Sequence, residues 1–119
     1  MTEDLIKKYQ INFQNKLDKY LTVDKWPFTN NGDLTLFLYN WGPTEIDTLL
    51  LPDIEQGLIN PNAQIDNGSE TISILIYKNN VTFYQGDDPP SSIPLHDFKS
   101  IVLAWRNFLT TLPLNGNKN

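Results

Sequence analysis

The chain has 119 residues, of which 39% are hydrophobic and 19% charged, and it contains no cysteine. This composition is typical of a single globular domain, expected to span residues 1–119, and it excludes a disulfide framework and thiol chemistry. No apolar run approaches the roughly 18 to 20 residues that a membrane span needs, and the N-terminus lacks the pattern of a signal peptide. We therefore expect a cytoplasmic protein without a membrane partner.

The net charge of −5 is unevenly distributed along the chain. Residues 33–97 carry ten acidic residues and one lysine, a net charge of −9, whereas residues 1–32 sum to +1 and residues 98–119 to +3. One interpretation is a solvated acidic surface. The other is a docking face for a basic partner, because opposed potentials steer encounter and reject wrong partners. Either surface would repel phosphate backbones, so nucleic acid is not an expected partner.

The first half of the chain is predicted to form one helix and one strand. Apolar residues recur every four positions in residues 3–22, which favours an amphipathic helix. Residues 26–33 are interpreted as a connection that ends in a turn, and the short apolar run 34–40 as a strand. The segment 44–61 contains Pro52, Gly57 and Pro61, so we expect a short strand or helical turn around 47–51 and otherwise a loop. The helical stripe of residues 3–22 comprises Leu5, Tyr9, Phe13, Leu17 and Leu21.

Residues 62–86 carry the strongest strand pattern of the chain. A turn is expected at 66–69, because Asn-Gly tolerates positive φ angles. Apolar and polar residues alternate in 71–78, a two-residue turn follows at Asn79-Asn80, and a second strand covers 81–85. These segments predict an antiparallel meander, followed by a polar link at 87–92.

The segment 93–112 predicts a C-terminal helix. Pro94 suits a first turn, Asp97 lies where the helix dipole favours an anion, and Pro113 and Gly116 end the helix. Its large apolar residues are spaced by three and four positions, which places them on one side of the helix. They are Phe98, Ile101, Val102, Trp105, Phe108, Leu109 and Leu112.

Together these elements predict an α+β fold in which an antiparallel sheet of about four strands packs against an N-terminal and a C-terminal helix. The sheet face toward the helices would hold Ile72, Ile74, Ile76, Leu34, Leu36 and Leu38. The opposite face would hold Phe37, Tyr39, Leu75, Tyr77 and Tyr84. That second face is too apolar to lie bare, so either the segment 42–61 covers it or part of it receives a partner.

The residues that could carry chemistry are few. The single histidine, His96, is followed by Asp97, and neighbours on a helix point in different directions, so the two cannot form a catalytic relay. One histidine without cysteine cannot make a zinc site, and the acidic pairs do not match a calcium loop. We expect no catalytic residue, no metal and no cofactor. A small enzyme or ligand-binding domain with a pocket between sheet and helices remains the alternative, because carboxylates distant in sequence can converge.

Partner binding is the function that the acidic middle segment favours. Exposed carboxylates would meet a basic partner, and tryptophan and tyrosine concentrate binding energy at interfaces. Trp26 is a further aromatic residue of this kind. The candidate partner-binding residues are Asp47, Asp53, Glu55, Asp66, Glu70, Asp87, Asp88, Tyr39 and Trp41.

The C-terminal segment resembles a known family. The run Ile93-Pro94-Leu95-His96-Asp97-Phe98, continued by Ile101, Trp105, Phe108 and Leu109, is similar to the last helix of small bacterial immunity proteins of contact-dependent growth inhibition and related polymorphic toxin systems. The strand pair within 71–86 is similar in style. The resemblance implies a cytoplasmic protein that binds one cognate toxin domain, often a nuclease, and blocks its active site. It assigns no toxin-contacting residue and no oligomeric state.

Overall fold

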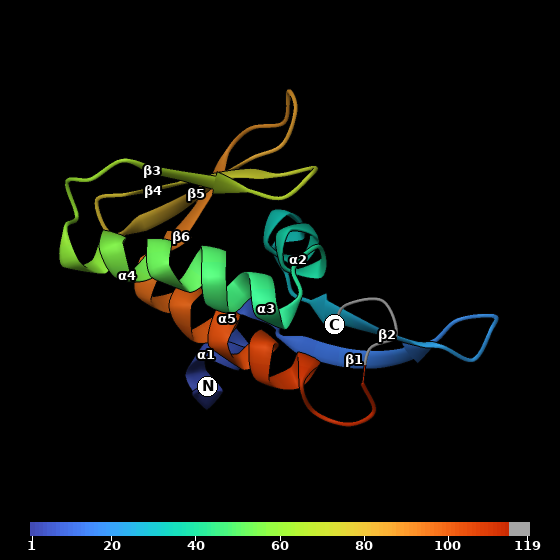
Figure 1. The fold of residues 1–119 in the computed structure, drawn as a ribbon. Coiled ribbons are helices and arrows are strands. Elements are labelled where there is room, and N and C mark those ends of the chain that lie inside the picture. Colours follow the sequence, from blue (N-terminus) through green and yellow to red (C-terminus); the bar gives the residue numbers. More distant parts are fainter. Residues whose placement is uncertain (115–119) are drawn as a thin grey trace.

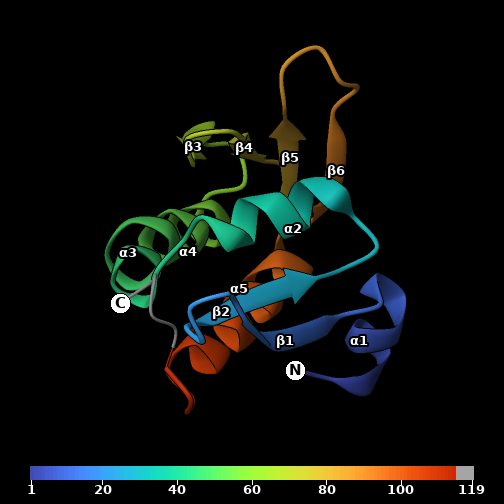
Figure 2. The ribbon, with the colours of Figure 1, turned by 90° about the vertical axis from the view of Figure 1, so that its right-hand side faces the viewer.

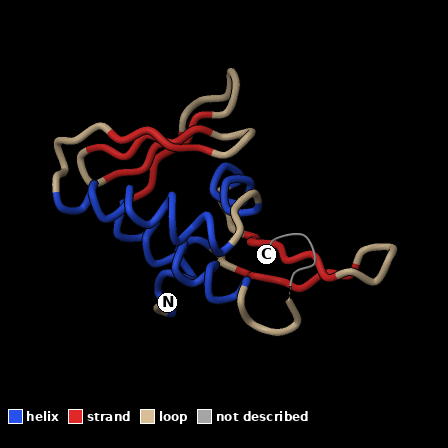
Figure 3. The backbone as a smooth tube through the Cα atoms, viewed as in Figure 1, coloured by secondary structure: helices blue, strands red, loops and turns tan. Residues whose placement is uncertain are grey.

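The structure is a computed structural model, and it describes residues 1–114. It confirms an α+β fold with a four-stranded antiparallel sheet in the order β3-β4-β5-β6 and a separate two-stranded sheet, β1-β2 (Figures 1 and 3). The helices are α1 (Glu3–Tyr9), α2 (Gly32–Tyr39), α3 (Pro43–Glu45), the π-helical η1 (Ile46–Leu50), α4 (Leu51–Ile59) and α5 (Leu95–Leu109). The strands are β1 (Asn12–Leu17), β2 (Val23–Phe28), β3 (Ile65–Gly68), β4 (Ser73–Tyr77), β5 (Asn80–Tyr84) and β6 (Ser91–Pro94).

The predicted meander exists, although two of its strands come from other segments than expected. Strands β4 and β5 match the predicted pair, and their two-residue connection is Lys78-Asn79, both with positive φ, because Tyr77 pairs with Asn80. The edge strands are β3, where a turn was predicted, and β6, where a polar link was predicted. The inward-facing row across the four strands consists of Ile65, Ile76, Val81 and Ile93, which are all buried.

The C-terminal helix is confirmed as the largest element of the core. It begins at Leu95, directly after Pro94, and ends at Leu109, so Leu112 lies beyond it and is exposed. Gly116, predicted to help end this helix, lies outside the described residues. Figure 1 shows α4 and α5 side by side beneath the four-stranded sheet. The predicted apolar stripe is buried at Phe98, Ile101, Val102, Trp105 and Leu109, and Phe108 is partly buried.

The predicted N-terminal helix over 3–22 is wrong beyond Tyr9. The chain leaves the helix at Gln10, which adopts a left-handed conformation with φ of 49°, and then forms the β1-β2 hairpin. A spacing of four residues fits a helix, but it is also an even number and therefore fits one face of a strand. Phe13 of strand β1 packs against Trp105, with 5.1 Å between the two ring centroids. The hairpin extends away from the other elements in Figure 1.

The predicted strand over 34–40 is also wrong, because this segment forms helix α2. The Asn31 side chain caps the helix by accepting hydrogen bonds from the backbone N–H groups of Asp33 and Leu34. Leu34, Phe37 and Leu38 are fully buried, whereas Leu36 is 38% exposed and faces away from the core. The predicted strand faces of this segment therefore do not exist.

The segment 43–59 is helical almost throughout, where a short element within a loop was expected. Pro43 stands in the first turn of α3, where a missing N–H has no intrahelical partner to lose. Pro52 is in the first turn of α4, directly after the π-helical turn η1. The π-helical turn η1 joins the two helices. Gly57 lets α4 approach the sheet closely, since a Cβ atom at this position would lie 2.5 Å from Ile76 Cγ2.

The outer sheet face is left open by this arrangement. Because α4 packs on the inner face, the segment 42–61 does not cover the opposite side. Of the residues expected there, Leu75 and Tyr77 are half-buried and Tyr84 is 43% exposed, while Phe37 is in the core. Within residues 1–114, no helix has both the length and the apolar character that crossing a bilayer requires.

Helix α1 is connected to the start of α5 by the partly buried carboxylate of Asp97. Asp97 accepts hydrogen bonds from Tyr9 at 2.6 Å and from Lys8 at 2.9 Å. Burial alone would raise the pKa of Asp97, but these hydrogen bonds and the Lys8 charge hold it below its ordinary value of 3.8. The same contact and burial raise the pKa of Tyr9. Asp97 therefore links the first and last helices as an ion.

This contact predicts a pH dependence of stability. The pKa of Asp97 is lowered by folding, so its contribution is fully present above its ordinary pKa and is lost as the pH falls through the lower folded value. Asp97→Asn should lower the thermal midpoint at pH 7, and the difference from the parent should shrink as the pH is lowered below about 4. Thermal scans of both proteins from pH 7 to pH 2.5 measure this. A difference that stays constant over the whole range would contradict it.

Candidate functional site

A groove of about 380 Å³ opens between the C-terminal end of α2, the start of the helical segment 43–59, and the end of β3 with the loop that follows it. We call it the acidic groove. Its lining residues are Asn40, Trp41, Glu45, Leu49, Asn67, Gly68, Ser69 and Glu70.

Hydrogen bonds between its two walls hold the acidic groove in shape. From the α2 side, the Asn40 amide donates to Thr71 Oγ1 at 3.2 Å. From the β3 side, Asn67 Nδ2 donates to the Leu49 carbonyl at 3.1 Å and to Asp53 Oδ2 at 2.7 Å. The amide side chains therefore tie the sheet to the helical segment, and they keep the Asp53 carboxylate next to a lining residue.

The charges of the groove all have the same sign. Glu45 and Glu70 line the groove and are exposed. Asp53 does not line it but accepts a hydrogen bond from the lining residue Asn67. The Glu45 carboxylate accepts a hydrogen bond from the Gly42 N–H at 3.3 Å, which fixes it at the first turn of the helix. No lysine or arginine is among the described lining residues. Three carboxylates without a lining cation create a negative potential that favours a cationic ligand.

Two apolar side chains accompany these charges. Leu49 lines the groove and is 56% exposed. Trp41 is only 4% exposed and packs against Phe37 at a ring distance of 5.4 Å. Its indole N–H has no hydrogen-bond acceptor among the described residues. A buried donor without an acceptor costs about 1 to 3 kcal/mol, so the Trp41 indole N–H lowers the stability of the folded protein.

Two of the predicted partner-binding acids lie elsewhere and are already paired. Asp47 forms a two-bond ion pair with Arg106, at 3.0 Å to Nε and 2.8 Å to Nη2, and Glu55 pairs with Lys99. The hydrogen bond from Arg106 lowers the pKa of Asp47 despite some desolvation. Both pairs join the helical segment 46–59 to α5. Asp53 and Glu55 lie in α4, where the sequence predicted a loop, and Asp47 lies in η1.

Three further predicted acids are exposed but do not line the groove. Asp66 lies within strand β3, not in a turn, opposite Leu75 of β4. Asp87 and Asp88 lie in the loop between β5 and β6. Of the nine predicted residues, the structure therefore brings Trp41, Glu70 and Asp53 together. Glu45, Leu49 and Asn67 join them without having been identified from the sequence, because only the path of the backbone places them beside the β3–β4 loop.

Tyr39 and Trp26 form a separate aromatic stack between α2 and β2. Their ring centroids are 4.0 Å apart, and the Asp24 carboxylate accepts hydrogen bonds from the Tyr39 hydroxyl and the Trp26 indole, both at 2.8 Å. Burial, followed by the contact with Asp24, raises the pKa of Tyr39 to about 12. These contacts assign both rings to the packing of the hairpin on α2.

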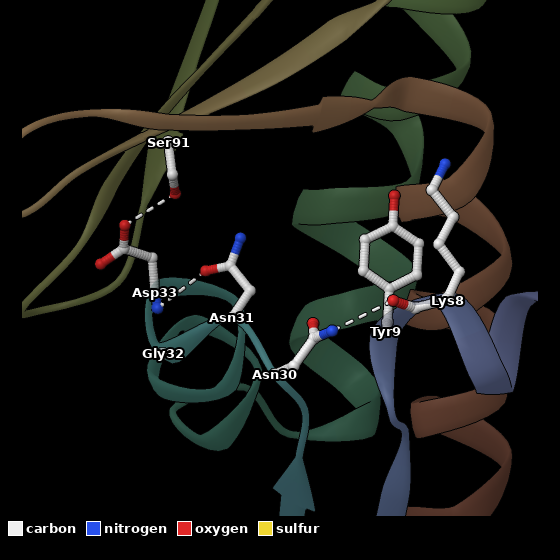
Figure 4. Close-up of a pocket in the computed structure, with 7 residues that line it drawn as sticks. All are labelled: Lys8, Tyr9, Asn30, Asn31, Gly32, Asp33 and Ser91. Carbon is white, nitrogen blue, oxygen red and sulfur yellow. Dashed lines mark hydrogen bonds between the residues drawn. The ribbon is translucent and has the colours of Figure 1, made fainter.

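A second, more open hollow of about 510 Å³ lies between the end of α1, the start of α2 and β6. Figure 4 shows Ser91 pointing toward Asp33 and Asn30 pointing toward the Lys8 backbone, while the Lys8 amine extends away from them. Asn30 donates to the Lys8 carbonyl at 3.1 Å, and Ser91 donates to Asp33 at 2.8 Å. Lys8 is bound to Asp97. Because these groups hold three elements together, the hollow presents fewer unengaged charges than the acidic groove.

Within residues 1–114, no group of three or more histidine, aspartate or glutamate side chains is placed to hold a metal ion. Comparison of the chain with protein-family models, with curated proteins and with solved structures finds no match in any of the three.

Proposed function

We propose that this protein is a non-enzymatic, cytoplasmic immunity protein that binds a basic toxin domain, such as a nuclease, and occludes its active site. The observation that carries the proposal is the acidic groove, where Glu45, Asp53 and Glu70 gather without a lining cation. A nuclease cleft is cationic because it must hold phosphates, so a surface with the opposite charge competes for the same groups. The resemblance of residues 93–112 to immunity proteins supports the same function.

Occlusion would follow from simple electrostatics and shape. Lysine or arginine side chains around the cleft of the toxin would reach the Glu45 and Glu70 carboxylates at the groove rim. The exposed Leu49 side chain would cover the apolar stems of these cations. Ion pairs that lose water at such an interface slow dissociation, and the surrounding unpaired acids accelerate association.

A protection assay tests this proposal. The C-terminal domain of the large protein encoded immediately upstream would be expressed in bacteria with and without this chain. Growth arrest by the domain alone and growth with the chain present are the expected results. An upstream domain that is toxic and stays toxic in the presence of the folded chain would contradict the proposal, as would a neighbourhood that encodes no toxic domain.

The alternative function, a small enzyme or ligand-binding domain, would use the hollow in Figure 4 as its pocket. The histidine available to it is His96, five positions after the lining residue Ser91. His96 is exposed, and the adjacent Asp97 is bound to Lys8 and Tyr9. Among residues 1–114, no side chain is bound to the imidazole that would orient it as a general base.

We therefore expect His96→Ala to leave protection unchanged in the growth assay, at the same expression level as the parent. Circular dichroism of the purified variant provides the control for folding. A folded His96→Ala variant that loses protection would favour the enzyme function over the binding function.

A further inference from the structure

The tip of the β1-β2 hairpin exposes three large apolar side chains within five residues. Leu17 is 67% exposed, Tyr20 is 76% exposed and Leu21 is 78% exposed. The β1-β2 hairpin projects from the rest of the molecule in Figure 1, and Figure 2 shows it on the side of α2 away from the four-stranded sheet. Leu17 is in the last pair of the two strands, with Val23, so Tyr20 and Leu21 belong to the turn at the hairpin tip. A cluster of this kind on a soluble protein marks an interaction surface.

The tip is also held in a fixed and unfavourable conformation. Asp18 Oδ1 accepts hydrogen bonds from the backbone N–H groups of Tyr20 at 2.8 Å and Thr22 at 2.9 Å. Leu21 has a φ of 60°, a left-handed conformation that glycine or asparagine adopts at lower cost. The chain thus places a leucine in water where a small polar residue would fold more easily. Folding alone does not explain this choice of residue.

The charge of the tip indicates which surface it fits. Lys19 lies between Leu17 and Tyr20, with its ammonium 5.0 Å from the centre of the Tyr20 ring. Lys16 precedes the cluster, and its ammonium lies farther down the hairpin, 4.7 Å from the centre of the Phe28 ring. The nearby Asp18 is engaged by the backbone of the turn. The tip is therefore apolar with a cationic rim. The acidic groove has the complementary properties, since Leu49 and Trp41 lie among the carboxylates of Glu45 and Glu70.

We infer that the hairpin tip of one molecule docks in the acidic groove of a second copy of this chain. Tip and groove are different surfaces, so each contact leaves one tip and one groove free, and association is head-to-tail. A contact of about six tip residues is small compared with a stable interface, so the association is weak and needs high protein concentration. The inference rests on the groove taking a basic partner, as in the proposed function. The tip would occupy the groove until that partner displaces it.

Sedimentation velocity of the full chain tests this inference at concentrations from 10 μM to about 1 mM. The parent should show a mass that rises with concentration, and 0.5 M NaCl should reverse the rise because it screens charges. Two variants should remain monomeric at every concentration. The tip variant carries Tyr20→Ser and Leu21→Asn, and the groove variant carries Glu45→Lys and Glu70→Lys.

Mixing the two variants separates head-to-tail docking from every other contact. The groove variant keeps an intact tip and the tip variant keeps an intact groove, so an equimolar mixture should form a 1:1 dimer that cannot grow further. A parent that stays monomeric at 1 mM would overturn the inference, and so would a mixture that stays monomeric. Binding of the monomeric parent to phosphatidylglycerol vesicles, lost in the tip variant, would instead assign the tip to a membrane surface.

Folding and partner binding provide the controls. Leu21→Asn should be at least as stable as the parent, because asparagine tolerates the left-handed conformation. The tip variant should still bind the upstream toxin domain, since its groove is intact. Loss of self-association with retained toxin binding supports both proposals. Self-association without any toxin binding would leave the docking inference standing and would remove the proposed function.

Discussion

Replacing Trp105 with alanine is expected to destabilise the protein by about 3 to 5 kcal/mol, the usual cost of emptying a buried aromatic site. Trp105 has no exposed surface and packs in one cluster with two rings, Phe13 at 5.1 Å and Phe108 at 5.9 Å. Its indole N–H donates to the Leu38 carbonyl at 2.9 Å. One side chain thus joins α5 to α2 and to the hairpin. Chemical denaturation monitored by circular dichroism measures the loss, and equal midpoints for variant and parent would contradict the packing.

A matched pair of substitutions serves as the control. Trp105→Phe removes the indole hydrogen bond to the Leu38 carbonyl, which keeps only backbone donors such as the Trp41 N–H at 3.1 Å. Trp41→Phe instead removes an indole N–H that has no acceptor among the described residues. Both variants lose similar volume. Trp105→Phe should therefore cost more than Trp41→Phe, by about 1 to 3 kcal/mol. The opposite order would show that the Trp41 indole has an important partner.

Neutralising the acidic groove is expected to weaken toxin binding at least 100-fold, which corresponds to about 2.7 kcal/mol. The variant carries Glu45→Gln, Asp53→Asn and Glu70→Gln. An amide oxygen can still accept the hydrogen bonds from Gly42 and Asn67, so the fold should be preserved. Losing one partner of a desolvated charge pair costs about 2 to 5 kcal/mol and speeds dissociation. Isothermal titration calorimetry with the upstream toxin domain measures the change.

The control for this variant changes the same number of charges elsewhere. Asp66→Asn, Asp87→Asn and Asp88→Asn remove three exposed carboxylates that do not line the groove. This control should slow association a few-fold and flatten its salt dependence, with little change in dissociation. Equal loss of affinity in both variants would mean that total acidity, rather than the acidic groove, attracts the partner.

The elements that could be predicted from the sequence are those whose pattern fits only one structure. The C-terminal helix has apolar steps of three and four over four turns, which no strand reproduces. The β4-β5 hairpin combines alternation with a two-residue turn in which Asn79 tolerates positive φ. In both cases local pattern and tertiary packing agree.

The two large errors come from patterns that fit both structures. A repeat of four residues, as in Tyr9, Phe13 and Leu17, is compatible with a helix and with one face of a strand. The contact of Phe13 with Trp105 favours the strand, and the sequence does not show this contact. For α2, the strand-like composition hid the i, i+3, i+4, i+7 spacing of Leu34, Phe37, Leu38 and Trp41. The Asn31 cap was the local evidence for a helix.

The candidate site was predictable only in its charge. Counting acids located the negative segment, but it could not separate structural ion pairs from carboxylates without a cation. Asp47 and Glu55 pair with the basic residues of α5. Glu45 and Glu70 lie 25 positions apart in sequence and come together because α3 and the β3–β4 loop flank the same groove. Distinguishing the carboxylates in structural ion pairs from those in the groove therefore requires knowledge of the tertiary fold.

The most direct measurement follows the three indole N–H signals in a nitrogen–proton correlation spectrum while the upstream toxin domain is added. The Trp41 indole lies in a side chain that lines the acidic groove, whereas the Trp26 indole is bound to Asp24 and the Trp105 indole to Leu38 in the core. Docking in the groove should shift the Trp41 signal in proportion to the bound fraction and leave the Trp26 and Trp105 signals in place. A saturating complex in which the Trp41 signal does not move, while the Trp26 signal does, would contradict the acidic groove as the binding site.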